Sequence, residues 1–166
     1  TLCVGICGYP GAPLQDAILD ATRVCQALMA IADGTHSLCT DVSEQQLAAA
    51  IVDFCDRGEH CDGCLLFFAG HAHEYDGRVF MQARDSEPGS TKFCLEDIML
   101  TIPAAAVFIG IANCCRLNLR HVIRSPRVVK PQRLPIVEKV KRKSQMHRRA
   151  RSYLLLYSCL AGEYSP

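Results

Sequence analysis

The sequence has no apolar run long enough to cross a membrane, since none approaches the roughly 18 residues that a span requires. It also has no charged segment followed by an apolar segment and a cleavage site, the pattern typical of a secretory signal peptide. We therefore expect no membrane partner and a cytoplasmic location, with the nucleus as an alternative. With 49% apolar and 21% charged residues among 166, the composition is that of a globular domain with its own core.

The eleven cysteines could suggest a disulfide scaffold, but they are scattered through the predicted strands and helices. Their number is odd, so reduced thiols fit better. Cys61 and Cys64 form a C-x-x-C pair, which would be consistent with a zinc or redox site. A structural zinc site needs a second pair of ligands at suitable spacing, and none is apparent, so we expect no metal. No motif indicates calcium either, and activation by calcium stays open.

Apolar runs alternate with segments of helical spacing along the chain. Strands are expected at Leu2–Cys7, His36–Thr40, Cys64–Ala69, Val79–Gln82 and Val107–Ala112. Helices are expected at Leu14–Ala30, from a capping box of Ser43 and Gln46 through Phe54, and at Leu95–Thr101. This alternation predicts a doubly wound α/β fold, in which helices flank a mostly parallel central sheet.

Two of the predicted strands end in reactive side chains. The run Val107–Ala112 stops at the sequence N-C-C-R, which ends in Cys115 and Arg116, and the run Cys64–Ala69 stops at Gly70 and His71. Groups just past the carboxyl end of a strand in an open α/β sheet face the crevice where ligands bind. A lone cysteine there is most often a small buried hydrophobe, and a lone histidine after glycine is usually a turn residue. Together, the two residues form a candidate catalytic dyad.

The spacing of the two blocks is similar to that of caspases, whose signature Q-A-C-[RQG]-G follows the histidine by about 50 residues. Here His71 precedes Cys115 by 44 residues. The opening L-C-V-G-I-C-G-Y-P-G-A-P-L-Q-D-A-I-L-D-A, the block F-F-A-G-H-A-H-E-Y-D-G and the block A-N-C-C-R-L-N resemble the corresponding blocks of the caspase-like cysteine peptidases, in particular paracaspases and metacaspases. The resemblance covers nearly the whole chain, and it implies a caspase-like, flavodoxin-like α/β sandwich.

The resemblance implies a role for each residue of the dyad. Cys115 would supply the thiolate nucleophile, and His71 would act as acid and base. The backbone amides of Cys115 and Ala72 would donate to the oxyanion. The family has glycine at position 72, so alanine restricts the backbone there. Cys114 is an alternative nucleophile if the strand register shifts by one residue.

The resemblance also implies a pocket for the substrate side chain. Paracaspases and metacaspases cut proteins and peptides after Arg or Lys, and carboxylates able to pair with a guanidinium would line such a pocket. Asp20 matches the acid of the first helix. Glu163, in the segment Y-S-C-L-A-G-E, matches the strand that closes the pocket. The third acid of the family is Asn113 here, which contributes no charge. A caspase pocket for Asp would instead use arginines, for which Arg116 alone is thin support.

Two other functions stay open. The substitutions at Ala72 and Asn113 allow a catalytically weak or inactive caspase-like domain that serves as a protein-interaction scaffold, whereas the retained His71 and Cys115 favour catalysis. A flavodoxin-like ligand-binding module would need a phosphate-cradling glycine loop, and the loop Gly8–Gly11 lacks that spacing. Whether the protein forms a homodimer also stays open.

Charge divides the chain into an acidic and a basic part. Residues 1–119 hold 6 Lys or Arg against 15 Asp or Glu, whereas residues 120–152 hold 12 against one, Glu138. The basic segment contains Pro126, Pro131 and Pro135 and little apolar periodicity, so it resembles a long loop. We therefore divide one domain into a large-subunit region, 1–119, an inter-subunit loop, 120–152, and the start of a small-subunit region, 153–166. We expect the domain to be part of a longer protein and the loop to bind no nucleic acid.

We predict that the active protein cleaves itself within residues 120–152. The connection after the catalytic strand is where caspase-like peptidases are processed, and an enzyme that cuts after basic residues would find many sites there. Mass spectrometry after prolonged incubation should detect two fragments whose new ends lie within this segment. A Cys115→Ala variant should stay whole. An intact loop in a preparation that cleaves added peptides would rule the idea out.

Overall fold

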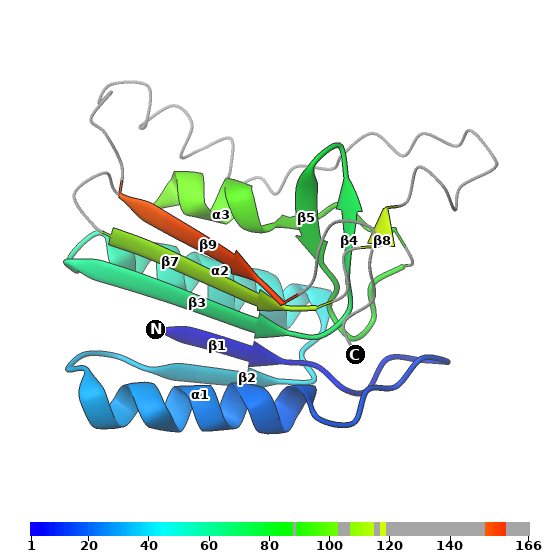
Figure 1. Cartoon of the computed structure of the whole chain (residues 1–166), viewed down its shortest axis with the longest axis horizontal. Coiled ribbons are helices and arrows are strands. Elements are labelled where there is room, and N and C mark those ends of the chain that lie inside the picture. The colour runs from blue at the N-terminus through cyan, green and yellow to red at the C-terminus, as the bar shows by residue number, and fades with distance from the viewer. Residues whose placement is uncertain (88, 103–106, 115–116, 119–151, 159–166) are drawn as a thin grey trace.

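The computed structural model describes residues 1–87, 89–102, 107–114, 117–118 and 152–158. Its strands and helices follow one another along the chain (Figure 1). In order they are β1 (Leu2–Gly5), α1 (Ala17–Ile31), β2 (Ser37–Thr40), α2 (Glu44–Gly58), β3 (Gly63–Ala69), β4 (Ala72–Tyr75), β5 (Arg78–Met81), β6 (Phe93–Cys94), α3 (Leu95–Thr101), β7 (Val107–Asn113), β8 (Leu117–Asn118) and β9 (Tyr153–Tyr157).

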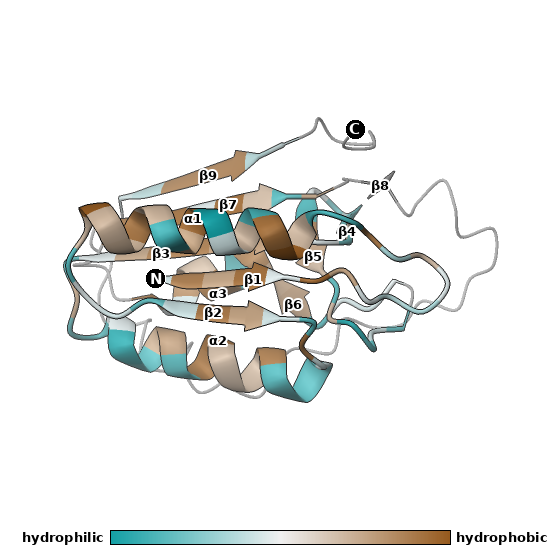
Figure 2. Cartoon of the chain, turned by 90° about the horizontal axis from the view of Figure 1, so that it is seen from below, coloured by the Kyte–Doolittle hydropathy of each residue, from teal (hydrophilic) through white to brown (hydrophobic). Residues whose placement is uncertain are grey.

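Within the described residues, five parallel strands form a central sheet in the order β2-β1-β3-β7-β9. Helix α1 covers one face of this sheet, and α2 and α3 cover the other (Figure 1). The inner strands β1, β3 and β7 are apolar at nearly every position because helices cover both faces of the sheet there, as their brown colour in Figure 2 shows. The predicted α/β sandwich with a mostly parallel central sheet is confirmed.

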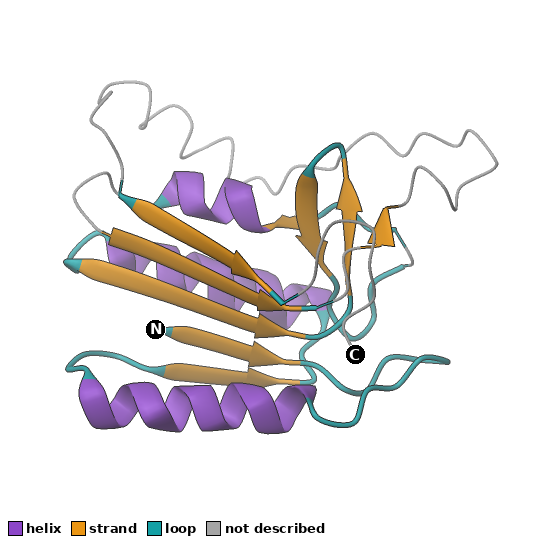
Figure 3. Ribbon diagram, in the orientation of Figure 1, coloured by secondary structure: helices purple, strands orange, loops and turns teal. Residues whose placement is uncertain are grey.

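A second, smaller sheet lies beyond the carboxyl ends of the central strands (Figure 3). Its order is β6-β5-β4-β8, and β4 pairs with β5 antiparallel and with β8 parallel. The turn between β4 and β5 contains Asp76 and Gly77, both at positive φ. The sequence indicated this turn but not β4, β6 or β8, because strands of two to four residues carry too few positions for a periodic pattern.

Most predicted boundaries differ from the observed ones by a few residues. Strand β1 ends at Gly5 rather than Cys7, because the amides of Cys7 and Gly8 donate to the Asp41 carboxylate and not to a neighbouring strand. Helix α1 begins at Ala17 rather than Leu14, and Leu14 belongs to the preceding loop, where its N–H donates to the carbonyl of Cys7. Helix α2 has the predicted capping box and continues to Gly58, four residues past the expected end.

Helix α1 packs directly on strand β1, with no side chain between them at one point. A Cβ atom at Gly5 would lie 2.6 Å from the carbonyl oxygen of Ala17 and 2.8 Å from the Cα of Ile18. Both contacts are to helix backbone, which cannot move aside as a flexible side chain could. Glycine at position 5 therefore sets how close α1 comes to the sheet.

We predict that Gly5→Ala destabilises the protein by about 1–3 kcal/mol, the usual cost of forcing an extra methyl group into a packed interface. Gly63→Ala is the matched control, because the added Cβ at the start of β3 would meet only the Val107 carbonyl, at 3.8 Å. Urea denaturation of both variants measures the difference. Equal stability of the two variants would contradict the packing argument.

Candidate active site

The candidate site lies where strands β3 and β7 end side by side. The two strands pair along their full length, and Ala69 lies opposite Asn113. The amide of Gly70 donates to the carbonyl of Asn113 at 3.3 Å, which continues the pairing one step further. His71 follows directly. The chain thus leaves the central sheet at two adjacent points, as expected for a site at the carboxyl edge of a parallel sheet.

The pairing resumes beyond this point in the same register. Strand β4 pairs with β8, and His73 lies opposite Leu117. The two residues of this pair are 44 positions apart along the chain, and so are Ala69 and Asn113. Cys115 and Arg116 fall between the two paired positions, outside the described residues.

The His71 side chain is half-buried, and the loop after β1 holds it. Its Nε2 lies 2.8 Å from the carbonyl oxygen of Ala12, and its ring centroid lies 4.5 Å from that of Tyr9, tilted by 47°. A carbonyl oxygen only accepts, so Nε2 carries the hydrogen in this contact. In the neutral ring, Nδ1 is then the nitrogen that can accept a proton. This arrangement suits a base whose orientation is held by its other nitrogen.

Cys114 belongs to the core. Its side chain is 3% exposed and packs in the apolar cluster between the sheet and α2. Its N–H donates to the Ser158 Oγ at 3.1 Å, which ties the end of β7 to the end of β9. A thiol in this position is buried as a small apolar group. The environment of Cys114 therefore favours packing over a role as nucleophile.

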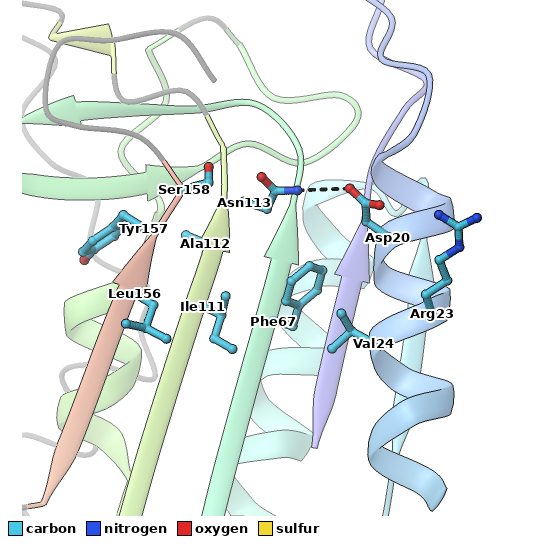
Figure 4. Close-up of a pocket in the computed structure, with 10 residues that line it drawn as sticks. All are labelled: Asp20, Arg23, Val24, Phe67, Ile111, Ala112, Asn113, Leu156, Tyr157 and Ser158. Carbon is cyan, nitrogen blue, oxygen red and sulfur yellow. Dashed lines mark hydrogen bonds between the residues drawn. The ribbon is translucent and has the colours of Figure 1, made fainter. Parts of the chain in front are cut away.

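A pocket of about 470 Å³ opens on the α1 face of the sheet, between the helix and the ends of β7 and β9 (Figure 4). It is lined by Asp20, Arg23, Val24, Phe67, Ile111, Ala112, Asn113, Leu156, Tyr157 and Ser158. Two predicted pocket residues meet here, because the Asn113 Nδ2 donates to the Asp20 Oδ2 at 3.0 Å (Figure 4). The third, Glu163, lies outside the described residues.

The pocket contains residues that the sequence did not single out. Arg23 lies one turn after Asp20 on α1, a spacing that places both on one helix face. Its guanidinium adds positive charge to a lining in which Asn113 is neutral. Of the segment predicted to close the pocket, the structure describes Tyr157, the last residue of β9, and Ser158, which follows it, and both line the pocket. No sequence pattern indicated Tyr9 or Ala12, because their contacts to His71 join segments about 60 residues apart.

Metal ligands and membrane spans are expected to be missing, and the described residues give the following picture. Among the described residues, no group of three or more His, Cys, Asp or Glu side chains is arranged to hold a metal ion. Cys61 is exposed, whereas Cys64 is buried on β3. No helix in the described part of the chain is long and apolar enough to cross a membrane.

The architecture is that of a caspase-like α/β sandwich, and comparison with known proteins identifies the family. A family model described as the caspase domain matches residues 1–166, the whole chain. The chain therefore belongs to the caspase-domain family, a family of cysteine peptidases whose substrates are proteins. None of the curated proteins matches the sequence.

Solved structures share the fold. The crystal structure of protein GSU0716 from Geobacter sulfurreducens aligns with a TM-score of 0.60 and 14% sequence identity. The alignment covers 98% of this chain and 73% of that chain. At this identity the likeness concerns the fold alone.

A second histidine lies near the site but is fully packed. His73, on β4, is 4% exposed, stacks on Phe80 with ring centroids 5.4 Å apart, and lies 2.9 Å from the Gln82 Nε2 through its Nδ1. The Gln82 amide nitrogen donates, so Nδ1 accepts and the neutral ring carries its hydrogen on Nε2. Burial lowers the pKa of His73 to about 4, because the charged form would lose its hydration.

We predict that His73 makes the protein less stable in mild acid. Its pKa in the folded state lies below the unfolded value of about 6.5, so the unfolded state binds more protons between these two pH values. The free energy of unfolding therefore falls as pH drops from about 6.5 to about 4, by at most about 1.4 kcal/mol per pH unit from this residue.

The measurement is urea denaturation across this pH range. His73→Gln should reduce the slope of stability against pH, whatever its effect at neutral pH. His60→Gln, at an exposed position, is the matched control and should keep the slope of the wild type. A slope unchanged in His73→Gln would show that other groups cause the acid sensitivity.

Proposed function

We propose that the protein is a cysteine endopeptidase that cleaves polypeptides after Arg or Lys, with Cys115 as nucleophile and His71 as acid and base. The observation that carries the proposal is the common register on both sides of the site. Ala69 lies opposite Asn113, and His73 lies opposite Leu117. Cys115 follows His71 by the same 44 residues in the sequence, and this common offset supports the proposed pairing of the two residues.

The proposed reaction is acyl transfer to the thiol. The Cys115 thiolate attacks the carbonyl carbon of the scissile bond, and the tetrahedral intermediate collapses as the C–N bond breaks. Protonated His71 gives its proton to the leaving amine. Neutral His71 then takes a proton from water, which attacks the thioester and releases the acid product and the thiolate. The atoms balance without a cofactor.

The geometry around Ala72 supports its backbone amide as an oxyanion donor. The amide of Gln82 donates to the carbonyl of His71 at 2.9 Å, so this pair forms the rung of the β4/β5 ladder that faces β5. Since successive residues of a strand direct their N–H groups to opposite sides, the N–H of Ala72 faces the β8 side, toward the β7–β8 connection. Ala72 has ordinary strand conformation and a buried side chain, so alanine in place of the family's glycine is not strained.

The pocket supports selection of a long basic side chain. Asp20 supplies a carboxylate, and the amide of Asn113 holds one of its oxygens. Phe67, Ile111 and Leu156 provide an apolar wall along which a Lys or Arg stem can pack. Arg23 opposes this preference by its charge. Asp20 therefore carries most of the attraction within the described residues, and Glu163 would add to it.

We predict that peptides ending in Arg or Lys at the scissile bond are cleaved and that peptides ending in Asp are not. Fluorogenic peptides of each kind measure the rates. Cleavage should fall to background in Cys115→Ala and in His71→Ala. The Cys114→Ala variant should retain cleavage, apart from any loss of stability that follows from truncating a buried side chain. Asp20→Ala should lower kcat/KM for the Arg peptide about 10- to 100-fold, the value of a charge-assisted hydrogen bond.

Each other outcome has a definite meaning. Cleavage after Asp would retain the dyad and overturn the basic specificity. Unchanged cleavage in Asp20→Ala would remove that residue from the pocket. A folded protein that cleaves none of the peptides would support the scaffold function, for which the neutral Asn113 is the specific observation.

A further inference from the structure

Tyr9 lies in the loop between β1 and α1 and has no role in the proposed reaction as described above. The loop is anchored to the neighbouring strand, because the Asp41 Oδ1 accepts the N–H groups of Cys7 at 2.7 Å and Gly8 at 2.8 Å. Tyr9 then turns back, donating its own N–H to the carbonyl of Cys7 at 2.9 Å. Its side chain is 8% exposed and belongs to the core cluster, so packing holds it in place.

The Tyr9 hydroxyl is inserted into the ladder between β4 and β5. It accepts the N–H of His71 at 2.9 Å and donates to the carbonyl of Gln82 at 3.0 Å. In a regular antiparallel rung, His71 and Gln82 would exchange both bonds directly. Here only the bond from the Gln82 N–H to the His71 carbonyl is direct. The hydroxyl therefore separates the His71 N–H from the Gln82 carbonyl just past the end of β5.

The same loop contacts His71 at two further places. The Tyr9 ring lies against the imidazole at 4.5 Å, and the Ala12 carbonyl is bonded to Nε2 at 2.8 Å. Gly70, which precedes His71, leaves room for the Tyr9 hydroxyl, since a Cβ atom at position 70 would lie 2.5 Å from it. One loop thus controls the backbone, the ring plane and the ring nitrogen of a single histidine.

We propose that Tyr9 is a positioning residue for the peptidase reaction, and this inference rests on the proposed function of His71 and Cys115. Its hydroxyl sets how far His71 stands from β5, and its ring sets the plane of the imidazole. Without the hydroxyl, the His71 N–H and the Gln82 carbonyl are left to bond directly. That bond would draw His71 toward β5 and away from the side on which β8 and the cysteine-bearing connection lie.

The hydroxyl itself does not titrate in the range of an assay. Burial raises the pKa of Tyr9, because the phenolate would lose its hydration. The phenol therefore remains a donor to Gln82 at every pH at which the protein is assayed. Any change in the pH profile of a Tyr9 variant reports on the dyad rather than on loss of a titrating tyrosine.

The test is Tyr9→Phe, which removes the hydroxyl and keeps the ring. We expect kcat for an Arg peptide to fall at least about tenfold, part of the 10²–10⁴-fold that a positioned acid–base group contributes, with KM changed less than about twofold. We also expect the pH profile of Cys115 alkylation by iodoacetamide to shift toward that of an ordinary thiol. Tyr153→Phe, at an exposed tyrosine on β9, is the matched control and should behave as the wild type.

A second variant covers the case in which Tyr9→Phe does not fold. Gly70→Ala keeps Tyr9 but drives a methyl group against its hydroxyl and, at 2.9 Å, against the Phe68 ring, and thermal unfolding shows whether either variant is folded at the assay temperature. Gly70→Ala should reproduce the fall in kcat and the shifted alkylation profile.

The outcomes separate this inference from the proposed function. If the wild type cleaves and depends on Cys115 and His71, but a folded Tyr9→Phe or Gly70→Ala variant has unchanged kcat and an unchanged alkylation profile, the positioning role is wrong and the peptidase stands. A loss of kcat with an unchanged profile also counts against it, because it indicates general damage to the fold. If cleavage by the wild type does not require Cys115, the proposed function fails and this inference fails with it.

Discussion

Strand β3 pairs with β7 in parallel over seven residues, and every feature of the candidate site depends on that register. Leu66 and Phe68 point into the cluster under α2, whereas Phe67 and Ala69 point into the cluster under α1. A slip of one residue in either strand would exchange the two faces and expose or misplace a complete set of apolar side chains. The core therefore determines which residue after β7 stands beside which residue after β3.

The loop after β1 adds a second constraint from another part of the chain. It is the only described segment whose contacts reach the backbone, the ring face and the Nε2 of His71. The loop is held by the carboxylate of Asp41, which accepts two of its backbone N–H groups. Asp41 follows β2 directly and has a positive φ. Three consecutive strands of the sheet, β2, β1 and β3, thus cooperate to hold one imidazole, which shows why a site at the carboxyl edge of a parallel sheet can be rigid although loops build it.

The lining of the pocket carries charges of both signs, from Asp20 and Arg23. Asp20 reaches the pocket because Gly5 lets α1 approach the sheet closely, one turn before the carboxylate. Asn113 holds that carboxylate in place without adding charge, and Arg23 stands on the same helix face. A single carboxylate attracts a basic side chain less strongly than a cluster of acids would, so under the proposed function the selectivity would depend strongly on how well Asp20 is held.

Local patterns in the sequence determined the order of the long elements. Continuous apolar runs predicted β3 and β7, helical spacing predicted α1 and α3, and the Ser43 capping box predicted the start of α2. These features depend on neighbouring residues, so a sequence displays them directly. The caspase resemblance, carried by the blocks around His71 and Cys115, indicated the family for the same reason.

Only the tertiary structure decided what lies around those residues. The short strands β4, β6 and β8 exist because partners far along the chain pair with them, and their own sequences carry too little pattern. The bond of Asn113 to Asp20 joins residues 93 apart, and that of Tyr9 to His71 joins residues 62 apart. Such contacts depend on how the sheet brings separate loops together, and no local propensity or spacing encodes them.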